Sequence, residues 1–161
     1  MTASVQRQPG CELCERRESP AWIEVVCDSR LRVLRVLDAP DFPAFYRVVW
    51  LGHVAELSDL ADADRAHCMA AVTAVERVLR GALAPTKINL AALGNMVPHL
   101  HWHVIARFDW DSHFPQPIWA PRQRDVQPPA AERLAAPMTM LDERVREAIR
   151  ALPGALVSIA P

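Results

Sequence analysis

The sequence predicts a single domain of the α+β class, and three observations indicate it. Short runs rich in β-branched and aromatic residues come first, one long helical pattern follows, and two further strand-like runs come after it. The chain has 161 residues, of which 51% are hydrophobic and 23% charged, which is enough to bury one good core. We therefore expect residues 1–161 to form one domain.

The first part of the chain contains three strand-like runs, WIEVVC (22–27), LRVLRVL (31–37) and FYRVVWL (45–51). The segments DSR and DAPDFPA between them are typical of turns. Short turns join antiparallel neighbours, because a parallel pair needs a long crossover. These runs predict an antiparallel meander.

Residues 58–83 predict one long amphipathic helix, which ends before Pro85. Its apolar residues recur every three or four positions, as in a helix with one buried face, at Met69, Val72, Val75, Leu79 and Leu83. The candidate N-caps are Ser58, Asp59 and Asp62.

Two further strands are expected after this helix, KINLAAL (87–93) and residues 99–107, with a Gly-Asn turn between them. In the second, histidines at 99, 101 and 103 alternate with apolar residues. Only a strand places residues i, i+2 and i+4 on one face, so we expect three imidazoles to point one way. With these two, the sheet has about five strands.

The C-terminal third predicts an extended arm followed by a helix. Residues 109–137 contain five prolines between positions 115 and 129, which excludes regular helix and central strand. Residues 139–152 predict a terminal helix, because apolar residues are again spaced by three or four, at Leu141, Val145, Ile149 and Leu152.

Composition excludes several classes of function. A net charge of −1 gives no general attraction to nucleic acid or to an anionic membrane, so we expect neither as a partner. Lys87 is the only lysine, which excludes a P-loop. The segment MTASVQRQPG lacks the apolar core of a signal peptide, and no apolar run approaches a membrane span. A cytoplasmic location is expected.

The four cysteines predict thiols or metal ligands rather than disulfides in a reducing compartment. Cys11 and Cys14, in CELC, have the spacing that lets one tetrahedral Zn²⁺ take both sulfurs. Because no second CxxC exists, the other ligands would be histidines, with His53 and His99 as the candidates. A redox pair or idle thiols is the alternative.

Three interpretations of the histidine strand follow from its chemistry. The rings can be solvated surface groups, or two of them can bind a catalytic metal together with an acidic ligand. The outer rings lie roughly 13 Å apart, too far to bind one ion together. In the third interpretation a neutral imidazole attacks phosphorus without a separate base, and a neighbouring imidazole serves the leaving oxygen.

The strand also resembles a known family motif. HLHWHVI (99–105) matches His-φ-His-φ-His-φ-φ, where φ is apolar, the signature of the histidine triad (HIT) superfamily of nucleotide hydrolases and transferases. Gly-Asn at 94–95 falls where that family usually has Gly-Gln, and Asn89 lies near its frequent asparagine. His53 resembles its His-x-x-x-Leu-x-x-Leu segment, and CELC resembles the CxxC of its zinc-containing branch. Residues 11–108 are covered.

The resemblance implies a HIT-like sheet of about five antiparallel strands on the long helix, usually in a homodimer with a small-molecule nucleotide across the sheet. His101 would be the nucleophile that forms a nucleotidyl-histidine, and His103 would donate to the leaving group. Asn95 would hold the phosphate, although it has one methylene less than the usual Gln and so can act through water. Asp38 would bind ribose hydroxyls, and Asn89 would be a further substrate-binding residue.

The resemblance further implies a structural Zn²⁺ and no organic cofactor. His99 would close a four-ligand site with Cys11, Cys14 and His53, leaving no open position for catalysis. This site would anchor the N-terminal segment to the histidine strand.

The implied reaction is hydrolysis of nucleotides at the α-phosphate, with AMP phosphoramidates and diadenosine tetraphosphate as candidate substrates. Leu100 and Trp102 flank His101, whereas the uridylyltransferase branch carries His-Pro-His, so the resemblance favours a hydrolase. The alternatives are a nucleotidyltransferase or phosphorylase of the same superfamily, and a non-catalytic, zinc-stabilised nucleotide-binding module.

Overall fold

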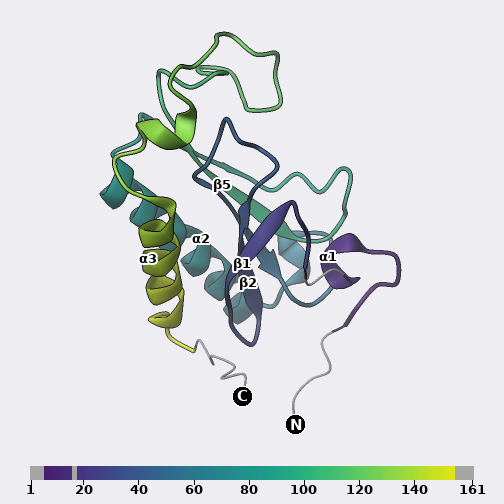
Figure 1. The fold of residues 1–161 in the computed structure, drawn as a ribbon. Coiled ribbons are helices and arrows are strands. Elements are labelled where there is room, and N and C mark those ends of the chain that lie inside the picture. The colour runs from purple at the N-terminus through teal and green to yellow at the C-terminus, as the bar shows by residue number, and fades with distance from the viewer. Residues whose placement is uncertain (1–5, 16–17, 155–161) are drawn as a thin grey trace.

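The computed structural model describes residues 6–15 and 18–154, which build one five-stranded antiparallel sheet with helices against it (Figure 1). The spatial order of the strands is β1-β2-β3-β5-β4. Their bounds are β1 Trp22–Cys27, β2 Leu31–Val36, β3 Phe45–Trp50, β4 Lys87–Ala91 and β5 His101–Arg107. The predicted α+β class, the meander and the five strands are confirmed.

Helices α2 (Asp62–Leu83) and α3 (Met138–Arg150) cover one face of the sheet. Their apolar stripes form one core with sheet residues such as Val33, Val48 and Val104, and the buried helix residues include Val72, Val75 and Leu79 of α2 and Leu141, Val145 and Ile149 of α3. Figure 1 shows α3 and the short helix α1 (Glu12–Glu15) on opposite sides of the sheet. The other face is therefore left for the N-terminal segment and for the histidines.

The predicted helix start was wrong by four residues. Residues Leu57–Asp59 form a separate 3-10 turn, η1, and α2 begins at Asp62 after the N-cap Ala61, which makes no side-chain cap. Ser58 and Asp62 are thus not N-caps. Asp59 instead accepts a hydrogen bond from the backbone N–H of Glu56 at 3.1 Å, which closes the turn on itself. The hydrogen bond between Asp59 and the backbone of Glu56 thus replaces the first turn of the helix that was expected from residue 58.

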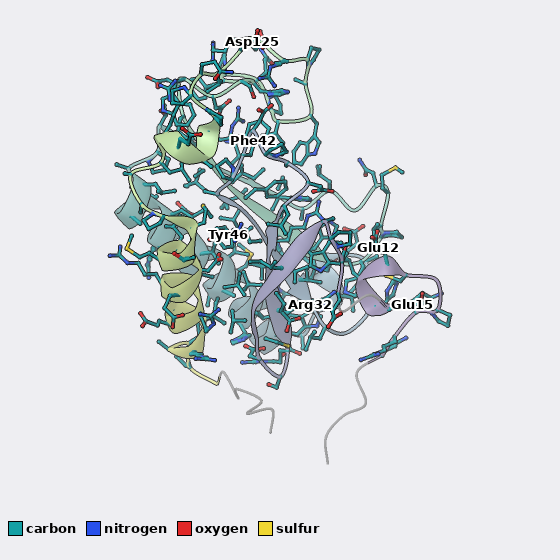
Figure 2. The ribbon with its side chains drawn as sticks, in the orientation of Figure 1. Glu12, Glu15, Arg32, Phe42, Tyr46 and Asp125 are labelled. Atoms are coloured by element: carbon teal, nitrogen blue, oxygen red, sulfur yellow. The ribbon has the colours of Figure 1, made fainter. Side chains whose placement is uncertain are left out.

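Helix α3 is tied to the sheet by a buried carboxylate. Asp142 of α3 accepts hydrogen bonds from the Tyr46 hydroxyl of β3 at 2.8 Å and from Arg35 Nε of β2 at 2.9 Å. Tyr46, labelled in Figure 2, is fully buried on the helix side of the sheet. Burial and the nearby Asp142 carboxylate raise the pKa of the Tyr46 phenol, which remains the hydrogen donor. The negative charge of Asp142 is thus compensated by Arg35 and by the Tyr46 hydroxyl.

Strand β5 begins at His101, so His99 lies just before the strand that was predicted to start there. The backbone N–H of His99 donates to the carbonyl of Val97, and that of Leu100 donates to Val54 beyond β3. The chain turns at this point before it enters the sheet. Consequently two histidines, rather than three, share the face of the strand.

Residues 109–137 form the predicted extended arm, interrupted by the 3-10 turn η2 (Ala130–Arg133). Figure 1 shows the arm looping beyond the end of β5, above the sheet. Helix α3 then starts one residue earlier and ends two residues earlier than the predicted 139–152. Among the described residues, no helix has the length and apolar character that crossing a bilayer requires.

Candidate active site and metal cluster

A pocket of about 410 Å³ opens on the face of the sheet opposite α2 and α3. Its floor carries His101 and His103 from β5 and Arg47 from β3. Its walls come from α1 and the start of β1 on one side and from residues 93–97 on the other. This volume lies within the range of small-molecule sites, about 300–1,000 Å³. The pocket gathers segments that are distant in the sequence around two imidazoles.

The ring of His101 is held in one tautomer by a backbone carbonyl. His101 Nδ1 lies 2.6 Å from the carbonyl oxygen of His99, and a carbonyl only accepts, so Nδ1 carries the proton. The lone pair is then on Nε2. Burial and the positive charge of Arg47 lower the pKa of His101, against the effect of the carbonyl. The free protein therefore presents a neutral imidazole with a fixed orientation.

His103 is the second ring of the pair, with its centroid 4.9 Å from that of His101. It packs against Phe45 at 5.4 Å and against Trp119 of the arm at 5.3 Å, and its Nδ1 is buried without a hydrogen-bond partner. Burial, His101 and Arg47 lower the pKa of His103 to about 3. His103 is neutral in the free protein, with an N–H group but no positive charge.

Two of the three predicted substrate-binding residues line the pocket. Asn95 lies in the wall between β4 and β5, after Gly94, whose φ of +67° allows the tight turn. Asp38 lines the pocket from the segment after β2. Asn89 is not among the lining residues, and its side-chain oxygen accepts a hydrogen bond from Arg107 at 2.7 Å.

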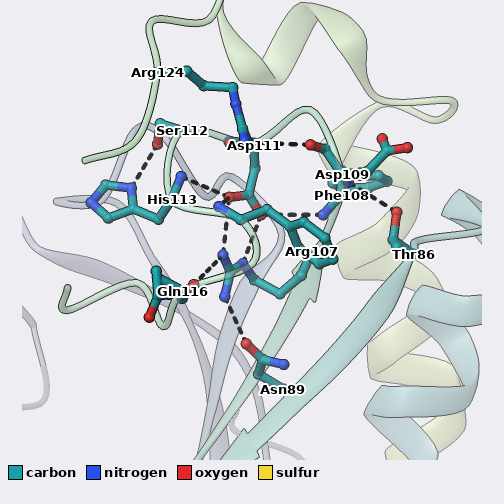
Figure 3. A network of polar contacts seen from close by, with 11 residues as sticks. Thr86, Asn89, Arg107, Phe108, Asp109, Asp111, Ser112, His113, Gln116 and Arg124 are labelled. Carbon is teal, nitrogen blue, oxygen red and sulfur yellow. Dashed lines mark hydrogen bonds and ion pairs between the residues drawn. The ribbon is translucent and has the colours of Figure 1, made fainter. Parts of the chain in front are cut away.

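Arg107 joins the arm to the end of β5 (Figure 3). Its guanidinium is almost fully buried and binds both oxygens of Asp111, at 2.7 and 3.0 Å, and the carbonyl of Gln116 at 2.8 Å. Arg107 therefore pairs with a carboxylate rather than facing the pocket. This network fixes the start of the arm, from which Trp119 reaches His103.

His113 belongs to the same network and not to the pocket. Its Nδ1 is 2.8 Å from the Ser112 hydroxyl, its backbone N–H donates to Asp111, and its ring lies 5.2 Å from that of Phe42. These contacts join the arm to Phe42, between β2 and β3.

Beside the pocket, four side chains form a cluster that could hold a metal ion, Cys11, Cys14, His53 and His99. Their ligand atoms all lie within 4.8 Å of one another. Cys14 Sγ is 3.3 Å from His99 Nδ1 and 3.4 Å from His53 Nδ1, and Cys11 Sγ is 3.4 Å from His99 Nδ1. A tetrahedral Zn²⁺ with ordinary bond lengths separates sulfur from nitrogen by about 3.6 Å. The donor set and its spacing fit this ion.

The surroundings of the cluster also favour a metal site. His99 Nε2 lies 2.6 Å from the carbonyl oxygen of Trp50, so Nε2 carries the proton and Nδ1 is free to bind a cation. Burial raises the pKa of the Cys14 thiol, whereas a redox-active CxxC cysteine has a lowered pKa. The predicted grouping of two cysteines with His53 and His99 is thus brought together in space.

A family model described as the HIT domain matches residues 17–110, more than half of the chain. The chain belongs to the HIT family. Its solved relatives agree in fold. A histidine triad protein from Bradyrhizobium japonicum is 28% identical, with a TM-score of 0.64 over 80% of this chain and 91% of that one. A HIT protein from Sinorhizobium meliloti is 26% identical, with a TM-score of 0.63 over 80% and 90%.

Among curated proteins, the HIT chain is 33% identical over 81 residues to an AP-4-A phosphorylase of Mycobacterium tuberculosis. The match covers 47% of this chain and 42% of that enzyme. The chain thus spans less than half the length of this curated relative.

We expect Asp111→Asn to destabilise this HIT domain by about 2 kcal/mol at neutral pH, because it weakens a buried charge-assisted network. Burial by itself would raise the pKa of Asp111, but the Arg107 guanidinium and two backbone N–H groups hold it below the usual value. The carboxylate therefore stabilises the fold above the unfolded pKa, near 3.8, and loses this effect as the pH falls through the lower folded value.

Urea unfolding of wild type and variant between pH 3 and 7 would measure the difference. It should be largest at pH 7 and shrink below about pH 4. Asp125→Asn is the control, since that carboxylate is in the same arm but almost fully exposed (Figure 2). A difference that stays constant with pH would contradict the prediction.

Proposed function

We propose that this protein is a nucleotide-processing enzyme that cleaves its substrate at the α-phosphate through a covalent nucleotidyl-His101, with water as the acceptor. The observation that carries the proposal is the tautomer of His101. Its Nδ1 proton is engaged by the His99 carbonyl, which leaves the Nε2 lone pair as the nucleophile on the pocket floor. A rigid central strand holds this ring in place, as in-line attack requires.

In the first step a bond forms between Nε2 and the α-phosphorus while the bond from phosphorus to the leaving oxygen or nitrogen breaks. His103 donates its N–H to that leaving atom. The negative charge of the substrate phosphates beside the ring would raise the pKa of His103 from its low value in the free protein, so His103 takes up a proton as the substrate binds and gives that proton to the leaving atom. In the second step water attacks phosphorus and gives a proton to neutral His103, the N–P bond breaks, and neutral His101 is restored with a nucleoside monophosphate.

The pocket walls support roles for two further residues. Asn95 can donate from its side-chain amide to the phosphate oxygens, and Asp38 can accept from ribose hydroxyls. Asn89 is assigned no substrate contact, since Arg107 occupies its side-chain oxygen. The open side of the pocket is bordered by Trp119, whose ring is about half exposed and available for stacking.

A phosphorylase is the second candidate, because the curated relative carries that name. In that case inorganic phosphate would replace water in the second step. AMP phosphoramidates and diadenosine tetraphosphate are the substrates to compare, with and without added phosphate.

We expect intact-mass measurement after a rapid, acid-free quench to detect a transient gain of one adenylyl group with either substrate. His101→Ala should lose the adduct and reduce turnover by at least about 10³-fold, because the nucleophile is removed. His113→Ala is the matched control, since this histidine lies outside the pocket, and it should keep the adduct. AMP release without dependence on His101 would refute the proposal. Release of ADP only when phosphate is added would favour the phosphorylase.

We propose that the Cys/His cluster holds a structural Zn²⁺. Four protein ligands leave no open position, so the ion would join α1 to the chain before β5 and would take no part in the chemical steps.

Metal analysis of protein purified without chelator should find about one Zn²⁺ per chain. Cys14→Ser should lose the metal and lower the melting temperature, because a ligand is removed from a closed site. Cys27→Ser should keep it, since Cys27 lies outside the cluster. Well under one Zn²⁺ per chain in the wild type would rule the assignment out.

The homodimer implied by the family resemblance remains a proposal. It is supported by β4, an edge strand of the sheet, near which Leu90, Leu93 and Met96 are exposed. Sedimentation at micromolar concentration should give about twice the 18.0 kDa of one chain. Leu90→Lys, which places a charge at this edge, should shift the mass toward one chain, and a monomeric wild type would contradict the proposal.

A further inference from the structure

Arg47 is a cation on the pocket floor. It lies in β3 and pairs in register with His103 of β5 on one side and with Leu34 of β2 on the other. Directly opposed residues on adjacent strands have their Cβ atoms about 5 Å apart on the same face. Its side chain therefore enters the pocket next to the two imidazoles, among the residues that line it.

The guanidinium of Arg47 has no hydrogen bond or ion pair among the described residues. Its Nε is buried without a partner, and the contact found for the group is with the Phe45 ring, 5.5 Å from the guanidinium carbon. By contrast, the buried guanidinium of Arg107 is bound to Asp111, Asn89 and Gln116. A half-buried cation without a bound anion costs desolvation energy that the fold does not recover.

The charges around Arg47 leave it available to an anion. Burial disfavours its charged form, while the carboxylates of Asp38 and Glu12 act in its favour without forming an ion pair with it. Among the described residues that line the pocket, Arg47 is the only lysine or arginine. Arginine binds phosphate oxygens through two N–H groups at once, a geometry that lysine lacks.

We infer that Arg47 binds the α-phosphate of the bound nucleotide and neutralises its negative charge while His101 attacks. The inference rests on the proposed nucleotidyl transfer and adds to it a specificity residue for the phosphate. A fixed positive charge beside the reacting phosphorus also stabilises the charge on its equatorial oxygens in the transition state. Asn95 alone offers only an uncharged amide for this purpose.

The test compares the calorimetric affinity of AMP with that of adenosine, which lacks the phosphate, for wild type, Arg47→Met and Arg47→Lys. If Arg47 contacts the phosphate, Arg47→Met should weaken AMP binding by about 10- to 100-fold and leave adenosine binding unchanged. Arg47→Lys should be intermediate, because it keeps the charge but not the paired donors. The substrate kcat should fall in the same order.

The melting temperature provides a second measurement. If Arg47 had a structural role, its substitution would lower the melting temperature, whereas the inference predicts no decrease. Arg47→Met should melt at the same or a higher temperature than wild type, since it removes an unpaired buried group. The matched control is Arg35→Met, which breaks the ion pair with Asp142 on the other face of the sheet. It should lower the melting temperature and preserve the preference for AMP over adenosine.

The outcomes separate the two proposals. If wild type forms the adduct and prefers AMP, but Arg47→Met keeps that preference, the inference about Arg47 is wrong and the proposed function stands. A lower melting temperature for Arg47→Met, with equal losses for both ligands, would assign Arg47 to the fold and also overturn the inference. If wild type neither prefers AMP nor forms the adduct, the proposed function itself fails, and the inference fails with it.

Discussion

The arrangement of the site depends on a single residue, His99, whose two ring nitrogens and carbonyl oxygen are all engaged. Its Nδ1 faces the thiols of the metal cluster, its Nε2 is bound to the carbonyl at the end of β3, and its own carbonyl holds Nδ1 of His101. The metal cluster, the sheet and the proposed nucleophile are therefore connected through one peptide unit and one ring. A displacement of His99 would change the position of all three.

Alternate side chains of β3 and β5 point to opposite faces of the sheet, so that one set forms the core and the other lines the pocket. Even-numbered residues such as Tyr46, Val48 and Val104 form the core with α2 and α3. Odd-numbered residues on the other face include Arg47, His101 and His103, which line the pocket. Because the core side is closely packed and the register is fixed by hydrogen bonds, the polar face has little freedom to shift.

Much of this organisation follows from local sequence patterns. The five strands, the long helix and the arm could be predicted, because periodicity and proline content are local properties of the sequence. The grouping of His53 and His99 with the CxxC was predicted from the number of ligands that a zinc site needs and from the family resemblance. The failures concern interactions between distant segments. His99 lies before the strand, at the point where the backbone N–H of Leu100 donates to the carbonyl of Val54. Arg47 was missed because an isolated arginine in FYRVVWL carries no motif, although its odd position in the strand could have placed it beside His103.

The arm, which is attached through Arg107 and Asp111, forms part of the pocket rim but does not belong to the sheet. The shape of the rim and the position of the imidazoles can therefore change independently. The imidazoles of the pocket belong to the sheet, whereas Trp119, which packs against His103, comes from a proline-rich segment that is held by Arg107 and by an ion pair between Arg122 and Asp41. Substitutions between residues 117 and 129 can reshape the rim of the pocket without disturbing the strand that holds the proposed nucleophile. Under the proposed function, changes in the arm would alter which leaving groups are accepted while the proposed reaction is preserved.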